Sequence, residues 1–135
     1  MKILLDTNIL VAAFTAYGFC ADVTSYCMTE HQIGSSEFIL TELAEKLQKK
    51  FNFSKSESLE VSGFIRKIAL IARYDENNLP KICRDVDDNH ILAAAKVLEV
   101  DCIVTGDPDL LVLKDYAGIR ILNPRNFWNW VTKQH

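Results

Sequence analysis

Short apolar segments alternate with longer segments of helical periodicity along the 135 residues of the chain. Residues 2–5, 102–105 and 119–122 are apolar runs of the length that buried strands have. Segment 68–74 is compatible with a strand but also continues the preceding helical pattern. The alternation predicts an α/β fold of three layers (α/β/α), in which helices cover both faces of a mainly parallel sheet. We expect residues 1–135 to form a single domain.

Capping residues mark where the predicted helices begin. Ser35 or Ser36 suits an N-cap, and Ser54 forms a capping box with Glu57. Asn123 precedes a proline that fits the first turn of a helix. With these signals, helices are predicted over residues 9–30 with a break near Gly18, from 35 or 36 to about 50, over 54–67 and 87–98, and from 124 onward.

Two acidic positions directly follow predicted strands. Asp6 comes after the first strand, and Asp107 comes after the strand that ends at Thr105. In open parallel sheets, ligands bind at the carboxyl ends of the strands. Both acids therefore lie where a functional site is expected.

Asp6 and Glu42 each have a purely structural interpretation as well. Asp6 could be a helix N-cap, although Asn8 offers the same cap and would leave Asp6 free. Glu42 lies at the edge of an apolar helical stripe and could form an exposed pair with Lys46.

Asp88 is harder to explain structurally. It lies on the same helical stripe as Ile91 and Ala95, which is predicted to be buried. A buried carboxylate is costly unless it is paired or bound to a cation. Asp85 and Asp87 are available as caps, so capping does not require Asp88.

Gly106 and Pro108 surround Asp107 in a turn that leads into a helix, and either Asp107 or Asp109 could cap that helix. Spacing does not decide which of the two would face a metal. Several carboxylates at one sheet edge repel one another without a cation, and a site without Cys or His ligands suits Mg²⁺ or Mn²⁺. Such ions support hydrolysis of phosphodiesters.

The net charge of −3 argues against nucleic-acid binding by a broadly basic surface. Bound cations or clustered basic residues would have to supply the affinity, and Lys46, Lys49, Lys50 and Lys55 form one such cluster. No apolar run approaches the ~20 residues of a membrane span, so we expect a cytoplasmic protein with no membrane partner. We expect His90 to lie on a helix surface.

Four segments, in this order, resemble the PIN-domain nucleases, and especially the small toxin ribonucleases of the VapC type in type II toxin–antitoxin systems. They are Leu-Leu-Asp-Thr-Asn-Ile-Leu at 4–10, Thr-Glu-Leu at 41–43, the Asp-rich start of an Ala-rich helix at 85–95, and Ile-Val-Thr-Gly-Asp-Pro-Asp-Leu-Leu at 103–111. The resemblance covers nearly the whole chain. The last segment is the most specific.

The resemblance implies particular roles for individual residues. Asp6, Glu42, Asp88 and Asp107 match the acids that hold one or two Mg²⁺ or Mn²⁺ ions, Asn8 and Thr105 match positions that orient them, and Asp109 matches a further acidic position. The implied reaction is endonucleolytic cleavage of RNA by metal-activated water, leaving 3′-hydroxyl and 5′-phosphate ends. A small antitoxin and a homodimer are the implied partners.

Other classes of function remain open at this point. A nuclease of RNA processing or quality control would use the same acids without an antitoxin. A non-catalytic RNA- or partner-binding α/β module would not need four acids. A receiver domain would need a phospho-acceptor Asp after a clear middle strand, and only Asp75 could provide it.

Overall fold

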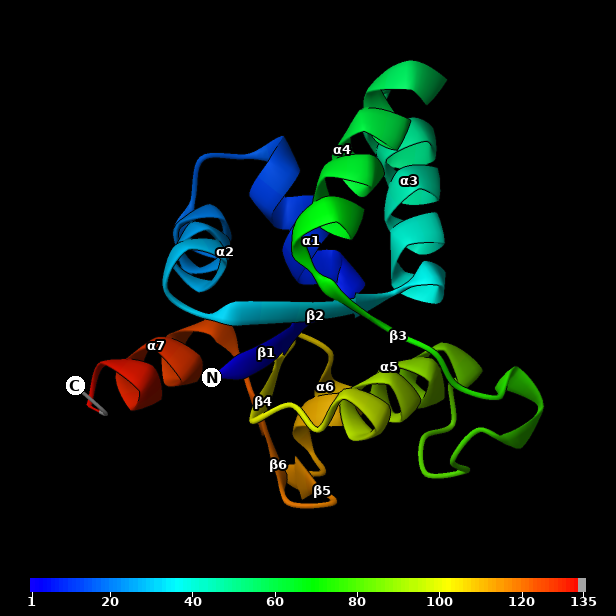
Figure 1. Cartoon of the computed structure of the whole chain (residues 1–135). Coiled ribbons are helices and arrows are strands. Elements are labelled where there is room, and N and C mark those ends of the chain that lie inside the picture. The colour runs from blue at the N-terminus through cyan, green and yellow to red at the C-terminus, as the bar shows by residue number, and fades with distance from the viewer. Residues whose placement is uncertain (134–135) are drawn as a thin grey trace.

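The computed structural model describes residues 1–133, with helices on both sides of a central sheet (Figure 1). Gln134 and His135 lie outside the described residues. The strands are β1 (Lys2–Leu5), β2 (Gln32–Ser36), β3 (Leu70–Ala72), β4 (Cys102–Val104), β5 (Asp115–Tyr116) and β6 (Ile119–Leu122). The helices are α1 (Thr7–Thr15), α2 (Phe19–Glu30), α3 (Glu37–Phe51), α4 (Lys55–Ile68), α5 (Val86–Leu98), α6 (Pro108–Leu111) and α7 (Pro124–Thr132), with a 3₁₀ turn η1 at Glu76–Asn78.

The strand order within residues 1–133 is β3-β2-β1-β4-β6-β5. Strand β1 is parallel to both of its neighbours, and Ile3 lies opposite Ile33 of β2 and Cys102 of β4. Only the short β5 is antiparallel among these strands. The predicted three-layer α/β fold with a mainly parallel sheet is confirmed.

The chain reverses its direction of travel across the sheet between β1 and β4. It moves outward from β1 to β2 and β3, and then returns to place β4 on the other side of β1. Figure 1 shows α1 to α4 on one side of the sheet and α5 and α6 on the other. Ligands of such sheets bind where the order reverses, at the carboxyl ends of the strands. Here that point is the end of β1 and β4.

Strand β2 was not predicted, because its sequence Gln-Ile-Gly-Ser-Ser lacks the apolar run of a buried strand. It is nevertheless buried, with Ser35 and Ser36 both at 1% exposure. The small residue Gly34 is explained by packing. A Cβ at Gly34 would lie 2.7 Å from the Leu98 side chain, so the glycine allows the end of α5 to approach the sheet.

The predicted helix boundaries agree with the structure at several caps. Gly18 separates α1 from α2, and the Ser36 side chain accepts a hydrogen bond from the Ile39 amide. Ser54 and Glu57 form both bonds of the capping box. The 68–74 segment divides into the end of α4 and the strand β3.

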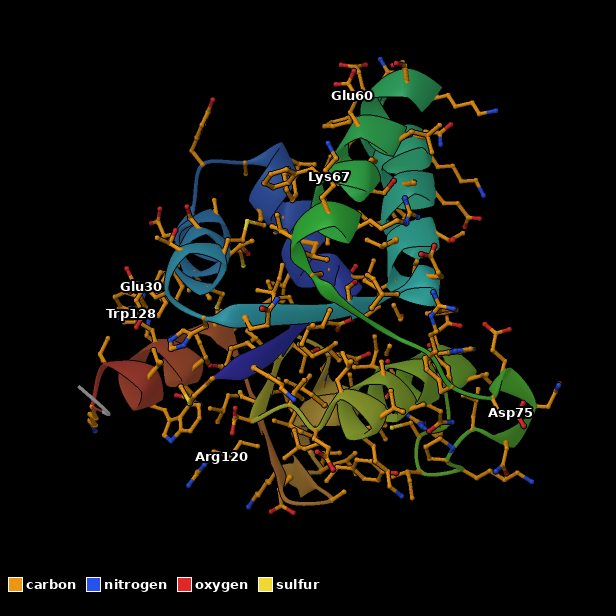
Figure 2. All side chains as sticks on the ribbon, viewed as in Figure 1. Glu30, Glu60, Lys67, Asp75, Arg120 and Trp128 are labelled. Atoms are coloured by element: carbon orange, nitrogen blue, oxygen red, sulfur yellow. The ribbon has the colours of Figure 1, made fainter. Side chains whose placement is uncertain are left out.

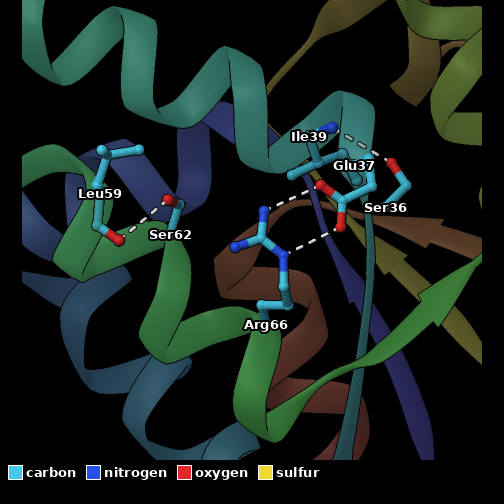
Figure 3. Close-up of polar contacts among 6 residues, drawn as sticks. All are labelled: Ser36, Glu37, Ile39, Leu59, Ser62 and Arg66. Carbon is cyan, nitrogen blue, oxygen red and sulfur yellow. Dashed lines mark hydrogen bonds and ion pairs between the residues drawn. The ribbon is translucent and has the colours of Figure 1, made fainter.

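Helices α3 and α4 form a hairpin that extends away from the sheet (Figure 1). Figure 3 shows Arg66 of α4 donating two hydrogen bonds, at 3.0 and 2.9 Å, to the Glu37 carboxylate of α3. These bonds hold the pKa of Glu37 below its usual value. Glu60 and Lys67 of α4 extend from the ribbon in Figure 2. The Glu37–Arg66 pair is largely exposed, so it contributes little to the stability of the hairpin.

His90 is buried, so the expectation of a surface position is wrong. Its ring stacks on Phe38 with centroids 4.0 Å apart, and its Nδ1 lies 2.9 Å from the Tyr74 hydroxyl. The helical pattern did not reveal this, because the covering residues come from other elements of the fold.

Helix α7 packs against α2 and β6. Phe127 and Val131 are fully buried, and Trp128, which is labelled in Figure 2, contacts Tyr26 edge to face with 5.0 Å between ring centroids. Across residues 1–133, no single helix is long and apolar enough to cross a membrane. Helices α1 and α2 reach the length and apolar composition of a membrane span only when they are taken together, and the chain bends by 108° between them.

Candidate active site

Asp6 follows β1 and is the N-cap of α1. Its Oδ1 accepts a hydrogen bond from the Thr7 amide at 2.7 Å, and its Oδ2 accepts one from the Thr105 hydroxyl at 2.6 Å. The idea that Asn8 could take this cap is wrong, because the strand ends at Leu5 and the helix already begins at Thr7. The Asp6 carboxylate therefore caps α1 and also lies in the candidate site.

The Asp6 carboxyl lies where its negative charge is costly. Burial is the largest influence and raises its pKa. The hydrogen bonds from Thr105 and Thr7 lower the pKa, whereas the charges of Glu42 and Asp107 raise it further. A nearby cation would favour the ionised form.

The Thr105 hydroxyl connects the ends of β1 and β4. It donates to Asp6 and accepts a hydrogen bond from the Asp107 amide at 3.0 Å. Thr105 is itself fully buried. Because one hydroxyl serves both partners, the positions of Asp6 and Asp107 are coupled.

Asp88 lies in the first turn of α5 with 6% of its surface exposed. Asp85 provides the cap, since its side chain accepts a hydrogen bond from the Asp87 amide at 2.9 Å. The Oδ2 atom of Asp88 is buried and has no hydrogen-bond partner among residues 1–133. A carboxylate oxygen in this position is stabilised by a proton or by a cation.

The pKa of Asp88 is raised to about 7. Burial is the largest cause, and the neighbouring Asp107 carboxyl comes next because it hydrogen-bonds the protonated form and repels the charged one. The charges of Asp85 and Asp6 act in the same direction. Near neutral pH, full ionisation of this group therefore calls for a compensating positive charge.

Asp107 and Asp109 both lie at the start of α6. Asp107 is the N-cap, and its Oδ1 accepts a hydrogen bond from the Asp109 amide at 2.9 Å. Carboxylate oxygens of Asp88, Asp107 and Asp109 lie within 4.8 Å of one another. Asp109 also accepts a hydrogen bond from Arg84 at 3.1 Å, in a pair so exposed that it contributes roughly 0–1 kcal/mol.

Glu42 is half-buried on α3, and Lys46 lies one turn further along the same helix. The Lys46 ammonium donates to Asn8 Oδ1 at 2.9 Å. A Glu42–Lys46 pair is not among the ion pairs formed by the described part of the chain. The one hydrogen bond described for the Asn8 side chain thus goes to a lysine rather than to an acid.

A pocket of about 90 Å³ gathers these side chains at the β1–β4 end of the sheet. Its lining consists of Asp6, Asn8, Glu42, Lys46, Asp85, Asp87, Asp88, Ile91 and Asp107. All four predicted acids are brought together. Thr105 contacts the pocket through Asp6, and Asp109 lies outside the lining beside Asp88 and Asp107.

Sequence reasoning missed four of the lining residues as site residues. Asp85 and Asp87 were considered only as caps, Ile91 only as part of a buried stripe, and Lys46 as a partner for Glu42 or as one of a cluster of basic residues. Each lies within about one helical turn of a predicted acid, and this proximity was the available signal. Arg84 was missed entirely, because an exposed arginine in a loop carries no periodicity.

The donor set fits a hard divalent cation. The pocket offers carboxylate oxygens and a side-chain amide, with neither Cys nor His in its lining. The buried Asp88 Oδ2 without a donor is the atom that a cation would satisfy. A larger hollow of about 450 Å³, lined by residues such as Phe14, Met28 and Phe64, contains none of these acids.

Several solved structures have the same fold. The chain is similar to a chain of the VapBC2 complex of Rickettsia felis bound to a DNA fragment from its promoter, with a TM-score of 0.65 and 17% identity over 91% of this chain and 98% of that one. It is also similar to a chain of FitAcB from Neisseria gonorrhoeae, with a TM-score of 0.60 and 19% identity over 91% and 98%.

A third similar structure is VapC20 of Mycobacterium tuberculosis, described as a toxin that cleaves the sarcin–ricin loop. Its TM-score is 0.59 and its identity 12%, over 87% of this chain and 98% of that one. At such identities the likeness shows the fold alone. No curated protein sequence matches the chain.

The sequence itself matches a family model. The PIN domain model matches residues 2–109, which extend from β1 through β4 to Asp109 and include every acid of the pocket. This match covers well over half of the chain, and the fold agrees with it. The chain therefore belongs to the PIN domain family.

Proposed function

We propose that this protein is a metal-dependent endoribonuclease whose single domain uses Asp6, Glu42, Asp88 and Asp107 to hold one or two Mg²⁺ or Mn²⁺ ions. The observation that supports this most strongly is the Asp88 carboxylate. It is buried among acids contributed by three other elements, and its Oδ2 has no donor within the described chain. Such an arrangement is costly without a cation.

The protein's own residues orient the carboxylates. Thr105 and Thr7 together occupy one lone pair on each oxygen of Asp6, which leaves the remaining lone pairs for a ligand. Thr105 also fixes the Asp107 backbone. The site therefore needs little rearrangement to bind a cation.

A bound Mg²⁺ or Mn²⁺ would lower the pKa of a water molecule and neutralise charge on the phosphodiester. The acids would hold that cation at the carboxyl ends of β1 and β4. Hydrolysis in this manner would leave 3′-hydroxyl and 5′-phosphate ends.

Asp107 is the fourth ligand in this proposal, rather than Asp109. Asp107 lines the pocket, whereas Asp109 lies outside the lining and accepts a hydrogen bond from Arg84. Asp109 would then assist a second cation or the substrate side of the pocket.

The biological role that we propose is that of a toxin held inactive by a small antitoxin, with a homodimer as the assembled form. Support comes from the PIN family match together with the fold likeness to chains of VapBC and FitAcB complexes. We expect the protein to act in the cytoplasm, where its RNA substrate would be found.

The test is cleavage of an end-labelled RNA by purified protein with Mn²⁺ or Mg²⁺. Asp6→Asn is expected to abolish cleavage, and excess chelator should have the same effect on the wild-type protein. Asp22→Asn is a matched control, because Asp22 is exposed on α2 away from the pocket. Undiminished cleavage by Asp6→Asn in chelator would rule out the proposal.

A further inference from the structure

Two cationic side chains border the acid pocket from different elements. Lys46 comes from α3, lines the pocket and donates to Asn8 Oδ1 at 2.9 Å. Arg84 immediately precedes the cap of α5, and its guanidinium donates to Asp109 Oδ1 at 3.1 Å. Both cations therefore lie beside the acid pocket.

The exposure of Arg84 argues against a role in stability. Its side chain is 89% exposed, and its contact with Asp109 is a single hydrogen bond. An exposed pair of this kind contributes little and opens readily. The guanidinium has five N–H donors, so most of them remain available to a ligand that approaches the pocket.

The backbone that carries Arg84 is nevertheless held firmly, by Asn89. The Oδ1 of Asn89 accepts hydrogen bonds from the Cys83 amide at 2.9 Å and the Ile82 amide at 3.3 Å. Its Nδ2 donates to the Cys83 carbonyl at 3.1 Å. Asn89 is buried, so a polar side chain in the body of α5 is used to fasten the residue next to Arg84.

The charge of the pocket explains why such cations matter. Six carboxylates occur in its lining, against one ammonium. One or two divalent cations would compensate the charge at the centre, but the phosphates on either side of the reacting one would still meet an acidic rim. An anionic polymer needs positive groups at those flanking positions.

We propose that Lys46 and Arg84 bind the RNA phosphates on either side of the scissile one, and that Asn89 positions Arg84 for this contact. The RNA strand then crosses the pocket from α3 to the loop before α5. The proposal rests on the proposed ribonuclease function and assigns how that site takes hold of its substrate.

Binding of a fluorescent single-stranded RNA across a salt series tests the proposal directly. It is measured by anisotropy in the Asp6→Asn background, so that cleavage does not interfere. Lys46→Gln and Arg84→Gln should each weaken binding about tenfold, as expected for loss of a charged hydrogen bond. Each should also lower the slope of log affinity against log salt by about 0.7, the value for one phosphate contact on a single strand.

Matched controls separate a specific contact from general charge. Lys50→Gln removes an exposed lysine one turn beyond Lys46, and Lys81→Gln removes one from the Arg84 loop. Both should change affinity less than twofold. Arg84→Lys should retain the salt slope but lose part of the affinity, because lysine lacks the guanidinium fork.

Asp109→Asn separates phosphate binding from an indirect effect through Asp109. If Arg84 only oriented Asp109, this variant would weaken RNA binding as Arg84→Gln does. Direct contact predicts the opposite, since removal of a negative charge beside the phosphate should tighten binding. For Asn89, the proposal predicts that Asn89→Ala weakens binding in the presence of Arg84 and has no further effect in Arg84→Gln.

The outcomes distinguish this inference from the proposed function. Two results would contradict the phosphate contacts but leave the nuclease proposal intact, provided that wild-type protein cleaves RNA. In one, Lys46→Gln and Arg84→Gln bind RNA as tightly as before. In the other, Lys50→Gln and Lys81→Gln lose as much affinity as they do. If wild-type protein does not cleave but binding depends on Lys46 and Arg84, the contacts stand and the nuclease proposal fails. If the protein does not bind RNA at all, the inference is overturned.

Discussion

The Thr105 hydroxyl lies 2.6 Å from the Asp6 carboxylate, although the two residues are separated by 99 positions in the chain. The same hydroxyl accepts the Asp107 amide. One buried side chain thus joins two acids at the point where the strand order reverses between β1 and β4. The geometry of the pocket therefore depends on a long-range contact as well as on the local caps at Asp6 and Asp107.

Thr105→Val is predicted to remove hydrogen bonds from the site without changing its volume. The variant keeps the side-chain shape but leaves Asp6 Oδ2 and the Asp107 amide without their partner, which should lower the free energy of unfolding by about 1–3 kcal/mol. The turnover number for RNA cleavage should fall by more than tenfold. Thr105→Ser retains the hydroxyl and should recover most of the activity; equal damage in both variants would contradict the assigned role.

The pH dependence of stability follows from the raised pKa of Asp88. Because this pKa is about 7 in the folded protein and 3.8 is the ordinary value, protonation stabilises the fold. Without metal, this contribution is fully present below about pH 4 and is lost as the pH rises through about 7. Melting temperatures in chelator should fall progressively between about pH 4 and 7, where the folded protein holds a proton that the unfolded chain has lost, and should level off above that range.

Metal binding should have the opposite pH dependence. A cation competes with the proton on Asp88, so the rise in melting temperature caused by Mn²⁺ should be small at pH 5 and large at pH 8, on either side of a pKa of about 7. A shift that is the same at both pH values would contradict competition at this carboxyl.

Asp88→Asn is predicted to raise stability and abolish the metal response together. In chelator at pH 8, above the pKa of about 7, the amide removes a buried negative charge from the acid pocket, so the variant should melt at a higher temperature than the wild-type protein. Addition of Mn²⁺ should no longer raise that temperature. Asp22→Asn is the control, because Asp22 is exposed on α2 away from the pocket. A lower melting temperature for Asp88→Asn in chelator would be evidence against a strained carboxylate.

Asp107 and Asp109 should respond differently to the same substitution. Asp107→Asn removes an acid that lines the pocket, and we expect at least a hundredfold weaker activation by Mn²⁺, which exceeds the roughly 10–100-fold loss typical of residues that only hydrogen-bond a metal ligand. Asp109→Asn should change the Mn²⁺ requirement less than tenfold, since Arg84 already compensates its charge. Titration of cleavage against Mn²⁺ measures both, and the reverse order would assign Asp109 as the fourth ligand.

The sequence predicted the sheet class and most helices because apolar runs and caps are local signals. Ser54 with Glu57 and Gly18 are examples that the structure confirms. Strand β2 was missed because its sequence lacks an apolar run and its burial comes from packing against distant segments, such as Leu98 next to Gly34. His90 was misplaced for the same reason, since its cover comes from Phe38 and Tyr74.

Asp6, Asp88 and Asp107 could be predicted because strand ends and the buried stripe of α5 are visible in the sequence, whereas Glu42 was predicted from the resemblance to the PIN-domain nucleases. Their mutual arrangement could not, because it depends on long-range contacts such as the one between Asp6 and Thr105. The choice of Asp6 over Asn8 as a cap required the end of β1 to be known. Arg84 becomes visible only once the Asn89 contacts place its loop beside the pocket.

The central claim is that these acids bind a cation and that this cation supports RNA cleavage. The most direct test is a Mn²⁺ titration in which bound Mn²⁺ and RNA cleavage are followed on the same samples of wild-type, Asp6→Asn and Asp22→Asn protein. We predict that binding and cleavage rise together in the wild-type and Asp22→Asn proteins, and that Asp6→Asn loses both. Cleavage that reaches its full rate with no bound Mn²⁺, or that persists in Asp6→Asn, would contradict the claim.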